Sequence, residues 1–193
     1  LTVSATPPYS LWDGVDYASL ANDQTSASYQ RELQEKHNWI EYHKWKLKAR
    51  TFTALSGNNK CFVLMTRVEM GLLGSYNSLK RSPFETYYMG GDGMSGYSST
   101  YATETIGLRG YDNGSLTPMG QEGYAYSRFA MELRYPLMFE NSTQIYALAF
   151  LEGGNAWTDV RKFNPFDMKR SAGVGVRIFL PMIGLMGIDW AYG

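Results

Sequence analysis

Apolar and polar residues alternate strictly along most of this chain, in segments close to ten residues long. In 44–54, for example, Trp45, Leu47 and Ala49 share one face while basic side chains occupy the other. A period of two is the repeat of a β-strand, in which successive side chains point to opposite faces. The pattern predicts seven strands, in the ranges 1–12, 44–54, 61–76, 124–135, 144–152, 170–180 and 184–192.

Two kinds of all-β protein produce this alternation. A soluble sandwich buries its apolar faces against a second sheet, whereas a transmembrane barrel turns them to lipid and its polar faces inward. The predicted strands are longer than the usual five or six residues, and about ten residues cross the apolar part of a membrane when tilted. Charged side chains lie in mid-strand, and aromatic side chains such as Trp45, Tyr135 and Trp190 lie near strand ends. These features favour the barrel.

The connections between the predicted strands alternate in length. The short ones are 55–60, 136–143 and 181–183, and the long ones are 13–43, 77–123 and 153–169. Outer-membrane barrels have short turns on one side of the membrane and long loops on the other. A sandwich has no reason to sort its loops in this way, so the connections also favour a barrel.

Net charge and the absence of known catalytic motifs argue against several classes of function. The formal net charge of the 193 residues is zero, so no overall field attracts nucleic acid. The histidines, His37 and His43, lie in "HNWIEYH", which is not the H-E-x-x-H zinc pattern, and no G-x-S-x-G nucleophile elbow is present. We therefore expect no catalytic residue, no metal and no cofactor.

The longest connection contains "LRGY", just ahead of a predicted strand. This stretch resembles the [V/I/L]-R-G-[F/Y] signature of the Omp85 superfamily of outer-membrane barrels. The resemblance rests on Leu108, Arg109, Gly110 and Tyr111.

A second element is similar to the F-x-[D/E]-x-G strand of the same superfamily. It is formed by Phe150, Glu152 and Gly154, and the tail "SAGVGVR…GLMGIDWAYG" is similar to the family's penultimate strands. The resemblance therefore extends over essentially the whole chain.

The resemblance implies that residues 1–193 are part of a single transmembrane β-barrel domain, about seven strands of a sixteen-stranded barrel. Connection 77–123 would be the sixth outward loop, which folds back into the lumen. Its Arg109 would contact Glu152, and the alternation independently assigns Phe150 and Glu152 to the inner face. Upstream POTRA modules and the last strand would lie outside this sequence.

Within the superfamily the chain most resembles the BamA-like branch, in a version similar to those of Bacteroidetes. This implies a non-enzymatic factor in the bacterial outer membrane that folds and inserts β-barrel proteins as the central barrel of the BAM complex. Its partners would be outer-membrane lipids, client β-barrel proteins and accessory lipoproteins, with no nucleic acid. An Omp85-type translocation pore, of the TamA or two-partner secretion kind, is the alternative; a porin or barrel enzyme is a weaker one.

Two inner-face features carry further expectations. Gly173 and Gly175 would leave room for a close approach of the returning loop. A basic row would line the lumen and be balanced by carboxylates on neighbouring strands; a nucleic-acid strip and a substrate funnel are its alternatives. The row consists of Lys44, Lys46, Lys48 and Arg50.

Overall fold

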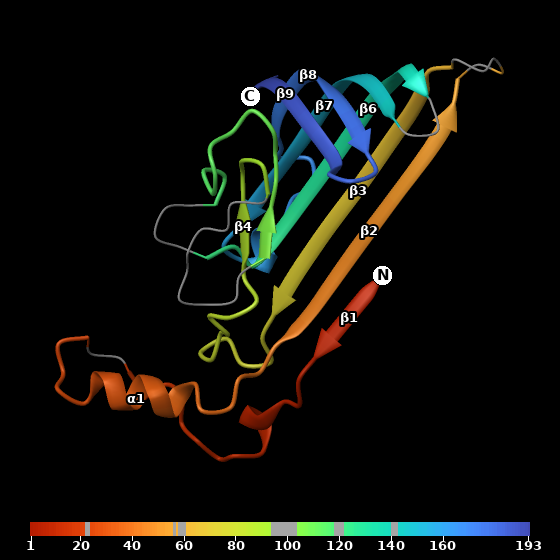
Figure 1. The fold of residues 1–193 in the computed structure, drawn as a ribbon. Helices are drawn as coiled ribbons and strands as arrows, with labels where there is room; N and C mark the ends of the chain where they lie inside the picture. Colours follow the sequence, from red (N-terminus) through yellow and green to blue (C-terminus); the bar gives the residue numbers. More distant parts are fainter. Residues whose placement is uncertain (22–23, 56, 58–60, 94–103, 118–121, 140–142) are drawn as a thin grey trace.

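A computed structural model of the chain describes residues 1–21, 24–55, 57, 61–93, 104–117, 122–139 and 143–193. Its main feature is a seven-stranded antiparallel sheet, which curls at the β7–β9 end (Figure 1). In sheet order the strands are β1 (Thr2–Ala5), β2 (His43–Ala54), β3 (Val63–Gly74), β6 (Ala125–Phe139), β7 (Gln144–Trp157), β8 (Lys169–Leu180) and β9 (Gly184–Tyr192). β1 and β9 are the edges, so the sheet is not closed. The prediction of an all-β antiparallel fold is confirmed.

The two faces of the sheet invert the arrangement of a water-soluble protein. On the outer face, large apolar side chains are exposed, including Leu151, Val174 and Ile188. On the inner face, Glu132 and Glu152 are buried. Strict alternation along each strand produces both faces, and the exposed apolar one suits a lipid environment. No helix among the described residues is long and apolar enough to cross a membrane.

The prediction of a strand over 1–12 is wrong beyond Ala5. Two prolines, Pro7 and Pro8, follow β1 and lack the N–H groups that a ladder needs, and a 3-10 turn, η1 (Tyr9–Leu11), comes next. Part of the expected loop 13–43 is helical instead, as α1 (Tyr29–Lys36).

Two strands run further than the alternation indicated. β6 continues past 135 because Pro136 lies at a register shift, where a missing N–H is tolerated. β7 continues past 152 because Gly153 and Gly154 stay paired with both β6 and β8. Glycines that resembled a strand end therefore lie inside the ladder. A second 3-10 turn, η2 (Val160–Lys162), follows β7.

The connection between β3 and β6 lies against the inner face of the sheet (Figure 1). It contains two short strands that pair in parallel, β4 (Tyr87–Met89) and β5 (Glu104–Ile106), so 77–123 is not loop throughout. We call its described residues, 77–93, 104–117 and 122–123, the in-folded segment. Its apolar side chains form a small core with the sheet, made of Leu73, Tyr87, Met89, Ile106, Leu108, Tyr126 and Ala156.

Candidate functional site

Arg109 lies within the in-folded segment, directly after the buried residue Leu108. Leu108 is fully buried in the small core and forms a bridge with Gly91, which fixes where the next residue starts. Gly110 has φ +89°, and a Cβ there would lie 2.9 Å from the carbonyl carbon of Tyr192. Only glycine combines that backbone conformation with so close an approach to β9.

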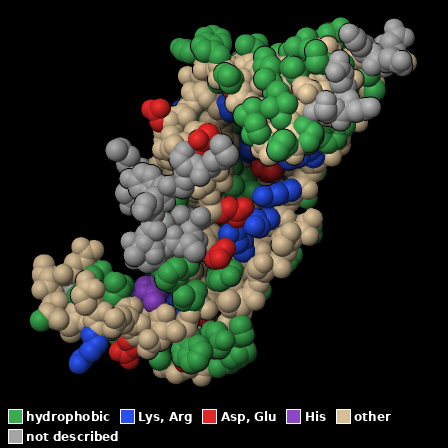
Figure 2. All heavy atoms as spheres, viewed as in Figure 1, with side chains coloured by type: hydrophobic (Ala, Val, Ile, Leu, Met, Phe, Trp, Pro, Cys, Tyr) green, Lys and Arg blue, Asp and Glu red, His purple; other side chains and the backbone are tan. Residues whose placement is uncertain are grey.

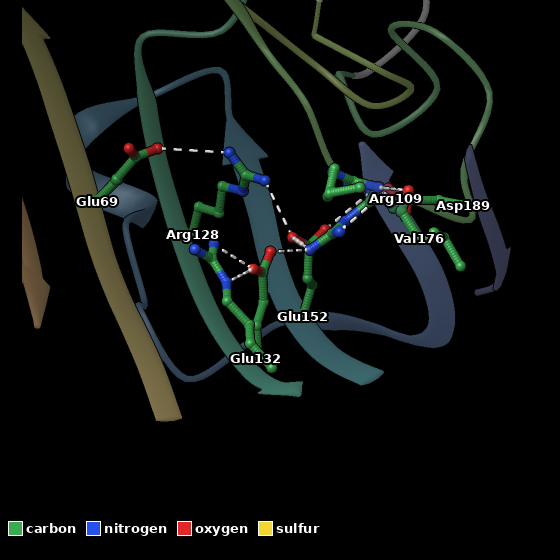
Figure 3. Close-up of polar contacts among 9 residues, drawn as sticks. Glu69, Arg109, Arg128, Glu132, Glu152, Val176 and Asp189 are labelled. Carbon is green, nitrogen blue, oxygen red and sulfur yellow. Dashed lines mark hydrogen bonds and ion pairs between the residues drawn. The ribbon is translucent and has the colours of Figure 1, made fainter. Parts of the chain in front are cut away.

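The guanidinium of Arg109 contacts three carboxylates from three strands (Figure 3). Its Nη2 lies 2.7 Å from Glu132 on β6 and 2.7 Å from Glu152 on β7, and its Nη1 lies 3.1 Å from Asp189 on β9. Its backbone N–H also donates to Glu152, at 3.0 Å. The guanidinium carbon stacks 3.5 Å from the centre of the Phe150 ring. We call Arg109, Glu132, Glu152 and Asp189 the arginine junction.

Each carboxylate of the junction is shared with a second arginine. The additional pairs are Arg134–Glu132 at 2.5 Å, Arg128–Glu152 at 3.0 Å and Arg177–Asp189 at 2.6 Å, and Arg128 also lies 3.7 Å from Glu69. Cations and anions therefore alternate across the inner face from β3 to β9 (Figure 3). This alternation lets charges that are largely withdrawn from water compensate one another.

The electrostatic environment keeps Arg109 charged. Burial by itself lowers the pKa of the Arg109 guanidinium, but the hydrogen bond and charge of Glu152, with those of Glu132, outweigh burial and raise it. A guanidinium does not exchange protons at physiological pH. Arg109 is therefore a fixed positive charge that connects the in-folded segment to three strands.

The other residues of the two motifs lie close to this junction. The Tyr111 hydroxyl donates to the backbone carbonyl of Arg170 at 2.8 Å, and its ring packs against the backbone of Gly193. Gly154 lets Met89 of the in-folded segment approach, since a Cβ would lie 2.3 Å from the Met89 methyl. The structure thus brings Leu108, Arg109, Gly110, Tyr111, Phe150, Glu152 and Gly154 into one region.

Sequence reasoning missed two partners of Arg109, namely Glu132 and Asp189. The alternation assigned both to the polar face of their strands, but no motif marks them. Their meeting depends on the stagger between strands, which pairs Glu132 with Phe150 and Asp189 with Gly175.

The expectation for Gly173 and Gly175 is wrong. The space beside Gly173 is taken by the Phe150 ring and a β9 carbonyl, and the space beside Gly175 by the Asp189 carboxylate. Both neighbours belong to adjacent strands, so the glycines admit inner-face side chains instead of the returning segment.

The three lysines of the basic row on β2 pair with carboxylates of the in-folded segment, not with carboxylates of neighbouring strands. Lys44 lies 2.8 Å from Glu85, and Glu104 lies 3.3 Å from Lys44, 3.1 Å from Lys46 and 3.6 Å from Lys48. Figure 2 shows these opposite charges gathered beside the in-folded segment. We call Lys44, Lys46 and Lys48 the lysine row; with Glu104 it is a second attachment of the segment.

The comparison with protein families agrees with this architecture. A family model described as the Omp85 superfamily domain matches residues 7–193. The chain belongs to the Omp85 superfamily. Proteins of this superfamily reside in the outer membranes of bacteria or organelles, where they insert or translocate polypeptides without enzymatic chemistry. A search of curated proteins found no match to the chain.

Proposed function

We propose that this chain is part of a BamA-like barrel, which folds β-barrel proteins and inserts them into the bacterial outer membrane as the centre of a BAM complex. The observation that carries the proposal is the double attachment of the in-folded segment, through Arg109 and through Glu104. A segment held in this way occupies the inner face. This arrangement favours a protein that handles clients at its barrel wall over one that passes them through its lumen.

The arginine junction would maintain the shape of that wall. Arg109 connects the segment to β6, β7 and β9 at once, so three strands keep one curvature only while the segment is docked. Main-chain groups left unpaired in lipid are costly, and a wall of fixed shape could present a client's strand with a partner of defined geometry. Client β-barrels, accessory lipoproteins and outer-membrane lipids would be the partners.

The test is the substitution Arg109→Glu in the intact protein in its own membrane. We expect the assembly of other outer-membrane barrels to fall, because four carboxylates would then crowd the junction. Arg161→Glu is the matched control, since Arg161 is exposed on the β7–β8 connection. Heat-dependent gel mobility of the variant would report its own folding.

Normal client assembly by a well-folded Arg109→Glu variant would contradict the proposal. The alternative, an Omp85-type translocation pore, predicts a different loss. If the protein is a translocation pore, its depletion should abolish export of a secreted polypeptide and leave the assembly of unrelated barrels intact.

A further inference from the structure

Two arginines face each other directly on the inner face of the sheet. Arg50 of β2 and Arg67 of β3 are register partners, on the same face as Lys48 and Glu69. Like charges directly opposite one another on a sheet are unfavourable. Among the described residues, neither guanidinium has a hydrogen bond or ion pair, and the Nε of Arg67 is buried without a partner.

This pair is an exception on the inner face. The four arginines of the alternating network, Arg109, Arg128, Arg134 and Arg177, each lie within 3.7 Å of a carboxylate. The carboxylates nearest to the pair along the sheet are already shared. Glu69 pairs with Arg128, and Glu132 serves both Arg109 and Arg134. Among the described residues, two adjacent cations therefore lack an ion pair of their own.

The same face of β2 already binds a carboxylate from outside the sheet. Glu104 of the in-folded segment lies across Lys44, Lys46 and Lys48, which occupy alternate positions along the strand. Arg50 is the next position of that series, and the ion pairs of Glu104 with described residues are to Lys44, Lys46 and Lys48. Three of the four basic positions of β2 thus hold the carboxylate of Glu104, and the fourth, Arg50, has no ion pair among the described residues.

We propose that Arg50 and Arg67 form an oxyanion-binding site for carboxylate side chains of a polypeptide inside the barrel. Two guanidinium groups on adjacent strands offer planar sets of donors that match a carboxylate bidentately. Free inorganic phosphate shares this chemistry and is the other source of an oxyanion. The site is separate from the arginine junction, and its existence does not depend on the assembly function.

A binding role for Arg50 and Arg67 predicts a change in thermal stability that a purely structural role for the two arginines would not produce. If the pair is kept for binding, the unliganded protein bears the repulsion between the two arginines. Arg50→Glu would place a carboxylate opposite Arg67 and relieve that repulsion. We therefore expect Arg50→Glu to raise the Tm of the intact protein while it abolishes binding.

The binding experiment uses the intact protein in detergent with a labelled glutamate-rich peptide, the same peptide with glutamines, and inorganic phosphate. We expect the glutamate peptide to bind, with an affinity that falls as salt is added, and the glutamine peptide not to bind. Arg50→Gln/Arg67→Gln should weaken binding about tenfold or more, as expected when charged hydrogen bonds are lost. The matched control is Arg31→Gln/Arg161→Gln, which removes equal charge from exposed positions outside the sheet.

The outcomes separate the alternatives. If the glutamate peptide binds and phosphate displaces it, the site exists and a polypeptide supplies its oxyanion. If phosphate binds and the peptide does not, the site exists and the small anion is its ligand. Binding that survives Arg50→Gln/Arg67→Gln would overturn the proposal. So would a fall in Tm on Arg50→Glu, because the protein itself would then neutralise the two arginines.

Discussion

The in-folded segment is attached to the sheet at two places that are built in opposite ways. At the arginine junction one cation serves three carboxylates on three strands, and the Glu152 side chain is fully buried. At the lysine row one carboxylate serves three cations on a single strand, and Lys48 is half exposed. The first attachment joins strands to one another, whereas the second joins the segment to β2 alone.

This difference has an energetic consequence. Removing Arg109 takes one of two arginines from each of Glu132, Glu152 and Asp189, and losing one partner of a buried ion pair is costly. Removing Glu104 leaves Lys44 paired with Glu85 and leaves Lys46 and Lys48 at positions that water reaches in part, where ion pairs contribute little. Substitutions at the arginine junction should therefore destabilise the protein more than substitutions at the lysine row.

Arg109→Ala should lower the free energy of unfolding by about 3–5 kcal/mol, the range for removing one partner of a buried ion pair. The physical reason is that Glu132, Glu152 and Asp189 each lose a cation at once. Denaturant unfolding of the intact barrel in detergent would measure the loss. Arg161→Ala should be nearly neutral, and a loss below about 1 kcal/mol for Arg109→Ala would break the contrast.

Gly110→Ala should cost about 1–3 kcal/mol, the range for a strained backbone conformation. A methyl group there meets both a left-handed φ of +89° and the backbone of β9. Gly57, where an added Cβ meets nothing within 4 Å, is the matched position, and Gly57→Ala should leave the unfolding midpoint unchanged. Equal effects at both glycines would show that the approach of Gly110 to β9 is unimportant.

Glu104→Gln should cost no more than about 1 kcal/mol at neutral pH, as expected for a partly exposed ion pair. Burial by itself raises the pKa of Glu104, but its hydrogen bond to Lys46 and the charge of Lys44 outweigh burial and lower it below the ordinary 4.5. A depressed carboxyl pKa contributes stability above the unfolded value, and this stability is lost as the pH falls through the folded value.

The difference between the wild type and Glu104→Gln should therefore shrink as the pH falls below about 4.5. Unfolding midpoints of the two proteins at pH 7 and at pH 3 would measure it. A difference that is constant over this range would show that the charge of Glu104 contributes no stability. A difference larger than that of Arg109→Ala would reverse the proposed order of the two attachments.

Much of the fold could be predicted because alternation is a local property. Which side chains share a face of a strand follows from the order of residues alone, and so the inner positions of Glu132, Glu152 and Asp189 were available from the sequence. The strand ends were less certain, because Pro136 and Gly154 are poor strand formers that the ladders on either side nevertheless retain. Helix α1 lies in a segment without a strand pattern, where the sequence predicted only a loop.

The order of residues is enough to predict a set of strands, the face to which each side chain belongs, and the two motifs that contain Arg109 and Glu152. The tertiary structure alone decided which charges meet. The stagger of neighbouring strands brings Glu132 and Asp189 to Arg109, and the folding back of residues 104–106 brings Glu104 to the lysine row. The physical reason is one of range: a period of two is fixed between successive residues, whereas an ion pair depends on groups separated by dozens of residues.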